Sequence, residues 1–141
     1  MVDYKTNPDK KPPTLAVIPE NIPAILKSLR KWVCWRWEWV DNEWTKPPVD
    51  VRTGAHASTT KRETWSTFSA ALKCLLNPDR GFDVDGIGFV LEPKDGIVGI
   101  DWDKVIDPET GEVLWDVRTD VEALEARPIK PILIFGSRCR N

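Results

Sequence analysis

The chain has 141 residues, of which 41% are hydrophobic and 30% are charged, and its formal net charge is −2. This length suits one domain with a core of its own, and the charge balance excludes a uniformly basic nucleic-acid-binding protein. No apolar run approaches the roughly 20 residues of a membrane-spanning helix, and three scattered cysteines are too few for a disulfide framework or a zinc cluster.

The first segment, residues 1–19, is polar and rich in proline, without the apolar stretch that a secretory signal requires. We expect a flexible arm here, and we expect the protein to be cytoplasmic, with reduced cysteines. Charge is uneven along the chain: residues 1–31 carry six Lys or Arg against three Asp or Glu, whereas residues 95–125 carry ten acids. Any contact with a polyanion would therefore be local or would use a metal ion.

A short helix is predicted next, because Pro23 is a favourable residue at a helix start and four apolar residues follow helical spacing. These are Ile22, Ile25, Leu26 and Leu29. Residues 31–40, KWVCWRWEWV, alternate with a period of two and predict one strand of high β-propensity. Residues 41–42, Asp-Asn, predict a hairpin turn, after which a shorter strand returns and stops at the proline pair 47–48.

Eight tryptophans are unusual for a chain of this length, and five of them lie between residues 32 and 44. Such a density can form a stacking surface for nucleic-acid bases or the apolar side of a core strand. Trp35, Trp37 and Trp39 share one face of the predicted strand, which favours the core. We expect Trp32 and Trp44 to be partly exposed, and no tryptophan is needed for base stacking.

A loop over residues 51–59 leads to a second predicted helix. Thr60 and Glu63 fit the T-x-x-E capping box, and apolar residues follow at helical spacing up to the Asn-Pro pair at 77–78. These apolar residues are Trp65, Phe68, Leu72, Leu75 and Leu76. His56, in the loop, is expected to be an ordinary surface residue.

Two further strands are predicted at residues 85–91 and 97–103, paired as a hairpin across the turn at 92–96. Asp83 and Asp85, just before the first of them, are expected to form a turn. A helix is predicted over residues 115–126. The order helix, hairpin, helix, hairpin, helix predicts an α+β fold with an antiparallel sheet rather than a doubly wound fold.

The segment GIVGIDWDKV, residues 96–105, resembles a buried strand that ends in two acids, Asp101 and Asp103. Side chains two positions apart share one face of a strand, so these two like charges need compensation. Water, a basic neighbour or a divalent cation could supply it. Carboxylates at this spacing suit a hard cation such as Mg²⁺, and two solvated acids at a strand end are the alternative.

Five stretches occur in a specific order: WVCWRWE, TKPPVDVRTGAHASTT, ETWSTFSAAL, DGIGFVLEPKDGIVGIDWDKV and DPETGEV. Together they resemble the N-terminal half of the bifunctional primase–polymerase domain of phage and plasmid replication proteins, in the archaeo-eukaryotic primase superfamily. The resemblance covers roughly residues 20–126. It implies an RRM-like core and template-directed nucleotidyl transfer with two metal ions. The implied partners are a DNA template, nucleoside triphosphates and a replicative helicase domain.

The resemblance also implies roles for single residues. Asp101 and Asp103 match the family's metal-binding carboxylates, which makes them the candidate catalytic residues and the ligands of Mg²⁺ or Mn²⁺. Lys46 matches the K-x-P segment and is the candidate phosphate contact. Ser58 matches the G-x-x-A-S loop, together with Gly54 and Ala57, and is a candidate substrate-binding residue.

The chain departs from the family after Ala126. Family members continue with a Ser/Gly-rich turn that leads to a phosphate-binding histidine, and a later acid completes the metal site, but residues 127–141 contain neither. We expect a truncated or frame-shifted copy with an unrelated tail, inactive by itself. The alternatives are a non-catalytic DNA- or partner-binding remnant of a replication protein, and an unrelated nuclease or glycosyltransferase that uses the same D-x-D.

Overall fold

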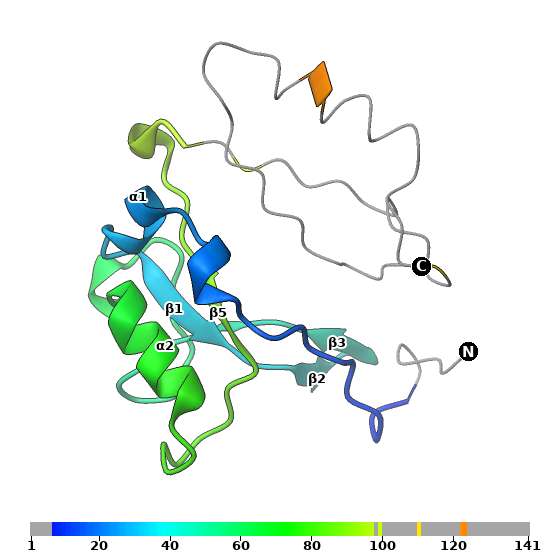
Figure 1. The fold of residues 1–141 in the computed structure, drawn as a ribbon. Coiled ribbons are helices and arrows are strands. Elements are labelled where there is room, and N and C mark those ends of the chain that lie inside the picture. The colour runs from blue at the N-terminus through cyan, green and yellow to red at the C-terminus, as the bar shows by residue number, and fades with distance from the viewer. Residues whose placement is uncertain (1–6, 98, 100–109, 111–121, 124–141) are drawn as a thin grey trace. The chain divides into compact units, whose positions relative to one another are not determined.

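The computed structural model describes residues 7–97, 99, 110 and 122–123 of the chain. The chain divides into two units with the boundary after Ile97, and the helices and strands between Pro19 and Asp95 belong to the first unit. This unit combines helices with small antiparallel sheets, which confirms the predicted α+β class (Figure 1). None of the helices within the described ranges could cross a lipid bilayer.

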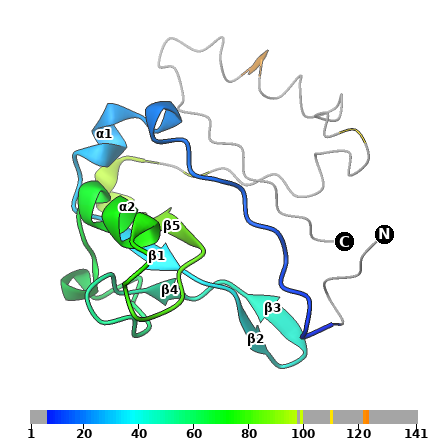
Figure 2. The same cartoon turned by 60° about the horizontal axis from the view of Figure 1, so that its bottom comes forward.

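A three-stranded antiparallel sheet in the order β4-β1-β5 is the centre of this unit. Its strands are β1 (Trp32–Trp35), β4 (Pro48–Val49) and β5 (Gly86–Phe89). Cys34 in the middle strand is opposite Val49 on one side and Ile87 on the other. Helix α2 (Phe68–Leu76) lies across one face of the sheet and contacts β1 and β5 (Figures 1 and 2).

The core lies between this sheet and the helices. Cys34, Val49 and Ala71 are completely buried, and the short helix α1 (Ala24–Lys27) adds Leu26. These residues come from two strands and both helices, so the core joins segments that lie far apart in the sequence. Their burial holds the ends of β1 in fixed positions, and the candidate functional residues are found at those ends.

Trp32 is a core residue, so the prediction that it is partly exposed is wrong. Only 4% of its surface is exposed. Its indole N–H donates to the Leu26 carbonyl (2.9 Å), and its ring meets Phe68 and Phe89 edge to face. The whole indole can enter the core because its one polar atom finds a partner there.

The predicted single strand over residues 31–40 is two strands in different sheets, β1 and β2 (Glu38–Val40), so this prediction is wrong. The chain leaves the central sheet after Trp35. The Trp37 N–H then donates to the Asp85 carboxylate (2.7 Å) instead of to a neighbouring strand. A period-two pattern continues through such a break, because the pattern reports side-chain faces and not ladder partners.

Strand β2 and strand β3 (Glu43–Thr45) form the second sheet, a hairpin that projects from the end of β1 (Figure 2). Asp41 and Asn42 have φ angles of 50° and 64°, as a type I′ turn requires at both central residues. The predicted hairpin turn is thus confirmed. The chain then passes into β4, which begins at the second residue of the proline pair and pairs with β1.

The first two predicted helices are present, but the second starts later than expected. Helix α2 begins after Thr67, whose hydroxyl accepts the N–H three residues further on (3.1 Å). Thr67 is therefore the N-cap, and the predicted capping box at Thr60 is wrong. Residues 65–66 are still extended, since Ser66 bridges to β1, so a helix cannot start at Thr60. A short 3-10 turn, η2 (Arg62–Thr64), precedes them.

Strand β5 lies inside the predicted strand 85–91, and its partner is β1. A capped 3-10 turn, η3 (Pro93–Asp95), follows it, in which Glu92 and Asp95 make reciprocal capping bonds. Three predicted segments lie largely outside the described residues: strand 97–103, helix 115–126 and the tail 127–141.

Candidate functional site

The predicted metal ligands, Asp101 and Asp103, lie outside the residues that the structure describes. Within the described ranges, no group of three or more His, Cys, Asp or Glu side chains is arranged to hold a metal ion. Carboxylate oxygens are the ligands that Mg²⁺ and Mn²⁺ prefer, so the donor chemistry of Asp101 and Asp103 fits either cation. The other two predicted site residues, Lys46 and Ser58, lie in the described unit.

Lys46 belongs to a cluster of aromatic side chains beyond the end of β1. Its ammonium nitrogen lies 4.4 Å from the ring centroid of Trp37 and 4.9 Å from that of Trp35, which are cation–π contacts. The two indoles pack edge to face with centroids 5.5 Å apart. Lys46 is exposed. Two rings therefore orient its positive charge at the surface, where an anion can reach it.

The tryptophan cluster also contains Trp44, which meets Trp37 and Trp39 edge to face at 6.5 and 5.4 Å. Its four indoles, those of Trp35, Trp37, Trp39 and Trp44, are half-buried. Partial exposure of Trp44 is thus confirmed, while the core position predicted for the other three holds only in part. The N-terminal segment 7–18 runs beside the hairpin (Figure 2), and the Trp37 indole donates to the Thr14 hydroxyl (3.0 Å). The cluster is a satellite core rather than a bare stacking surface.

A carboxylate next to the tryptophan cluster links β2 to the loop that follows β4. Glu38 accepts hydrogen bonds from Arg36 (2.6 Å) and from the His56 ring (2.9 Å). The hydrogen bond from His56 is the main cause that lowers the pKa of Glu38; burial opposes it, and Arg36 adds to it. The His56 side chain is 58% exposed, as a surface residue should be. Its position nevertheless ties the loop to the hairpin.

Ser58 organises the loop that leads to Trp65. Its N–H donates to the Thr64 hydroxyl (3.0 Å), its hydroxyl bonds with that of Thr60 (3.0 Å), and its carbonyl accepts from the Trp65 indole (2.6 Å). Lys46, by contrast, lies in the tryptophan cluster. The two predicted substrate contacts thus have different neighbours, although their segments are adjacent: the N–H of Ala57, next to Ser58, donates to the carbonyl of Pro48 (2.8 Å).

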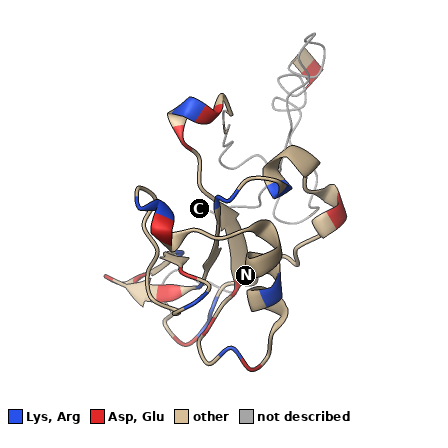
Figure 3. Ribbon diagram, turned by 90° about the vertical axis from the view of Figure 1, so that its left-hand side faces the viewer, with Lys and Arg blue, Asp and Glu red and all other residues tan. Residues whose placement is uncertain are grey.

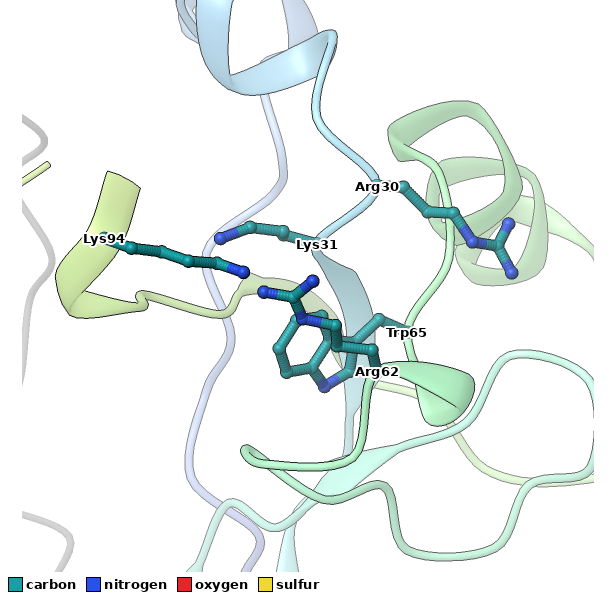
Figure 4. Close-up of a pocket in the computed structure, with 5 residues that line it drawn as sticks. All are labelled: Arg30, Lys31, Arg62, Trp65 and Lys94. Carbon is teal, nitrogen blue, oxygen red and sulfur yellow. The ribbon is translucent and has the colours of Figure 1, made fainter. Parts of the chain in front are cut away.

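Basic and acidic residues are interspersed along the described ribbon (Figure 3), but one pocket gathers several bases. This basic pocket has a volume of about 300 Å³ and lies beside the start of β1, at the opposite end from the tryptophan cluster. Its lining residues are Arg30, Lys31, Arg62, Trp65 and Lys94. In Figure 4, Lys31, Arg62 and Lys94 point toward one another, whereas Arg30 points away from them.

Two carboxylates hold the converging cations together. Glu92 accepts from Lys31 (2.6 Å) and, through both of its oxygens, from Arg62 (2.9 Å each), and Lys94 is 3.9 Å away. Asp95 pairs with Lys31 as well. Burial by itself would lower the pKa of Lys31, but the bonds to Asp95 and Glu92 raise it. The bond from Lys31 in turn lowers the pKa of both carboxyls, so these groups stay charged at neutral pH.

The basic pocket was not predicted from the sequence. Lys31, Arg62 and Lys94 lie far apart in the chain, and only the tertiary fold brings them together. The one local signal is the stretch E-P-K-D, residues 92–95, whose acids occupy the two positions of a capping box. That signal predicts a turn but not the cations that collect around it.

No model of a known protein family matches the chain, and no curated protein matches it.

Proposed function

We propose that the chain is the N-terminal part of a primase–polymerase-type domain that transfers nucleotides to a DNA strand on a template, in phage or plasmid replication. In this proposal, the described unit is one portion of an RRM-like core. The predicted strand 97–103 would pair with β5 and would present Asp101 and Asp103 at its end. The substrates are nucleoside triphosphates, and a replicative helicase domain is the expected protein partner.

One observation carries the proposal: strand β5 passes through the capped turn η3 directly into the segment that contains the two acids. Within the described residues, β5 has β1 on one side only, so its other edge can accept a further strand. An antiparallel sheet with a helix on one face also suits an RRM-like core. The order of the five sequence stretches supports the same assignment.

Each residue then has a defined task. Bound Mg²⁺ or Mn²⁺ supplies charge that polarises the nucleotide's α-phosphate and lowers the pKa of the attacking hydroxyl. Asp101 and Asp103 hold the ion through their ionised carboxylates. Lys46, oriented by its two indoles, contacts a phosphate of the nucleotide or template, and Ser58 is the second candidate substrate contact.

The metal role is tested by titrating Mn²⁺ in the presence of dATP and measuring the free ion by electron paramagnetic resonance. The variant is Asp101→Asn with Asp103→Asn. The control is Asp107→Asn with Glu109→Gln, which removes the same charge at the same spacing a few residues further along the chain. We expect the control to bind Mn²⁺ as the wild type does, and the test variant to bind it at least about tenfold more weakly, as loss of a charged ligand implies.

Primer extension with Mn²⁺ gives the functional measurement for the same three proteins. We expect no extension by any of the three proteins, because the chain lacks the family's phosphate-binding histidine and later acid. Extension by the wild type and the control, but not by the test variant, would support the metal role and show that the chain is active by itself. Equal Mn²⁺ affinity in all three proteins would overturn the proposal. The non-catalytic DNA-binding alternative predicts a different result. In that case the wild type binds a primer–template without metal, the test variant binds it equally well, and none of the proteins extends it.

A further inference from the structure

We propose that the basic pocket is a phosphate-binding site that takes a phosphate group of a nucleotide or of a DNA end without a metal ion. The site uses Lys31, Arg62 and Lys94. It goes beyond the function proposed above, because it involves neither Asp101 nor Asp103 and its ligand binds in the absence of Mg²⁺ or Mn²⁺.

Charge in the basic pocket is not balanced by its own carboxylates. Three converging cations, Lys31, Arg62 and Lys94, surround Glu92 and Asp95, which leaves a surplus of one positive charge. Arg30 at the edge of the pocket adds another. Both carboxylates stay ionised, since their pKa values are lowered. The surplus of positive charge attracts an added anion even with both carboxylates ionised.

Two of the cations have hydrogen-bond donors to spare. Arg62 uses Nε and one terminal nitrogen on Glu92, and its other terminal nitrogen bonds to none of the described residues. Lys94 is 3.9 Å from Glu92, which is too far for a hydrogen bond. The side chains of Arg62 and Lys94 are 55% and 59% exposed. A ligand can reach both without any rearrangement of the core.

The wall of the basic pocket is rigid and apolar. Trp65 is only 1% exposed, and its N–H is already donated to the Ser58 carbonyl (2.6 Å). The indole therefore offers a ligand no hydrogen bond and cannot stack on a base. It limits the access of water on one side, which strengthens the attraction between the cations and an anion.

A phosphate group fits these donors better than a carboxylate does. Its tetrahedral oxygens can accept from Arg62 and Lys94 along different directions, and it carries up to two negative charges. A guanidinium fork is also suited to two phosphate oxygens at once. The volume of about 300 Å³ is at the lower limit of ligand sites, so a phosphate or pyrophosphate fits better than a whole nucleotide.

The test measures the affinity of inorganic pyrophosphate for the full chain by isothermal titration calorimetry, at low salt and in excess EDTA. The variant is Arg62→Gln with Lys94→Gln. The matched control is Lys61→Gln with Lys73→Gln, two exposed lysines without a side-chain hydrogen bond or ion pair in the described unit. We expect the variant to bind about tenfold to a hundredfold more weakly, as for loss of charge-assisted bonds, and the control to bind as the wild type does.

Wild-type affinity in the Arg62/Lys94 variant would overturn the proposal. An equal loss in the control would also overturn it, because binding would then reflect overall charge. Thermal unfolding shows whether each variant is folded, and pyrophosphate should raise the Tm of the wild type and the control only. Asp101→Asn with Asp103→Asn should bind pyrophosphate normally, so this site and the metal site can fail separately.

Two further ligands identify the source of the phosphate. One comparison uses dATP against deoxyadenosine, and the other uses a short oligonucleotide with or without a 5′-phosphate. If only dATP binds more tightly than its unphosphorylated counterpart, the basic pocket is assigned to nucleotides. If the 5′-phosphate raises the affinity of the oligonucleotide, the pocket is assigned to DNA ends. If the phosphate raises the affinity in neither comparison, both assignments are refuted, and the proposed site with them.

Discussion

A methyl group added at Gly86 would collide with the Trp35 indole. A Cβ built at Gly86 lies 2.5 Å from Cε2 and 2.7 Å from Cζ2 of that ring, far inside the roughly 3.5–4 Å of normal carbon contact. The two residues are directly opposite each other in the β1–β5 ladder. Trp35 also contacts Lys46, so a shift of the ring would disturb the candidate phosphate contact as well.

Overpacking of this kind costs about 1–3 kcal/mol. Replacing glycine by alanine also restricts the unfolded chain, which stabilises the folded state by about 0.4–1 kcal/mol. We therefore expect Gly86→Ala to lower the free energy of unfolding by about 1–2 kcal/mol. Gly88→Ala is the matched control in the same strand. Its Cβ would lie 3.5 Å from the nearest side-chain atom, on Val33, which is an ordinary contact, so we expect no loss.

Urea unfolding followed by circular dichroism measures both variants. A double-mutant cycle isolates the contact, because Trp35→Val keeps a strand-forming residue but removes every atom of the clash. In that background, Gly86→Ala should cost less than about 0.5 kcal/mol. Equal costs for Gly86→Ala and Gly88→Ala, or an unchanged cost in the Trp35→Val background, would refute the reasoning.

Three further predictions concern single side chains. Thr67→Ala removes the N-cap of α2 and should cost about 1 kcal/mol in urea unfolding, whereas Thr60→Ala should cost little; the reverse order would restore the predicted capping box. Hydrogen bonds from Arg52 lower the pKa of Asp50. The stability that the ionised Asp50 carboxylate contributes is therefore complete above about pH 4, and it is lost as the pH falls through the folded-state pKa. Asp50→Asn should therefore lose less stability than the wild type in acid, and parallel stability curves would contradict this. Burial raises the pKa of Cys34 to about 12, so mass spectrometry should find it alkylated by iodoacetamide at pH 8 only after unfolding, and rapid labelling of the native protein would be inconsistent with it.

Elements set by local chemistry could be predicted from the sequence. The turn at Asp41 and Asn42 follows from two residues that tolerate positive φ, and α2 follows from apolar residues at helical spacing. The break between β1 and β2 could not be predicted in this way. It depends on a hydrogen bond from Trp37 to Asp85, a residue far along the chain. The capping error has a similar cause, since the bridge between Ser66 and β1 delays the start of the helix.

The candidate sites show the same difference between local and tertiary signals. The family resemblance singled out Lys46 as a candidate phosphate contact, but only the folded hairpin shows that two indoles orient it. The basic pocket has no sequence pattern, because Lys31, Arg62 and Lys94 come from separate segments. Charge counts along the chain also missed it, since Arg62 and Lys94 have acidic residues next to them in the sequence.

Strand β1 supports both positive surfaces, one at each end. Trp35 ends the strand and holds Lys46, whereas Lys31 directly precedes the strand and lines the basic pocket. Lys31 and Trp35 are four positions apart, roughly 13 Å along the strand, and the buried core around Cys34 lies between them. A change at Gly86 acts on the Trp35 end alone, because Lys31 is held by the turn at 92–95 and not by that indole. The two surfaces can therefore bind separate phosphates on a rigid support, and a defect at one end does not imply a defect at the other.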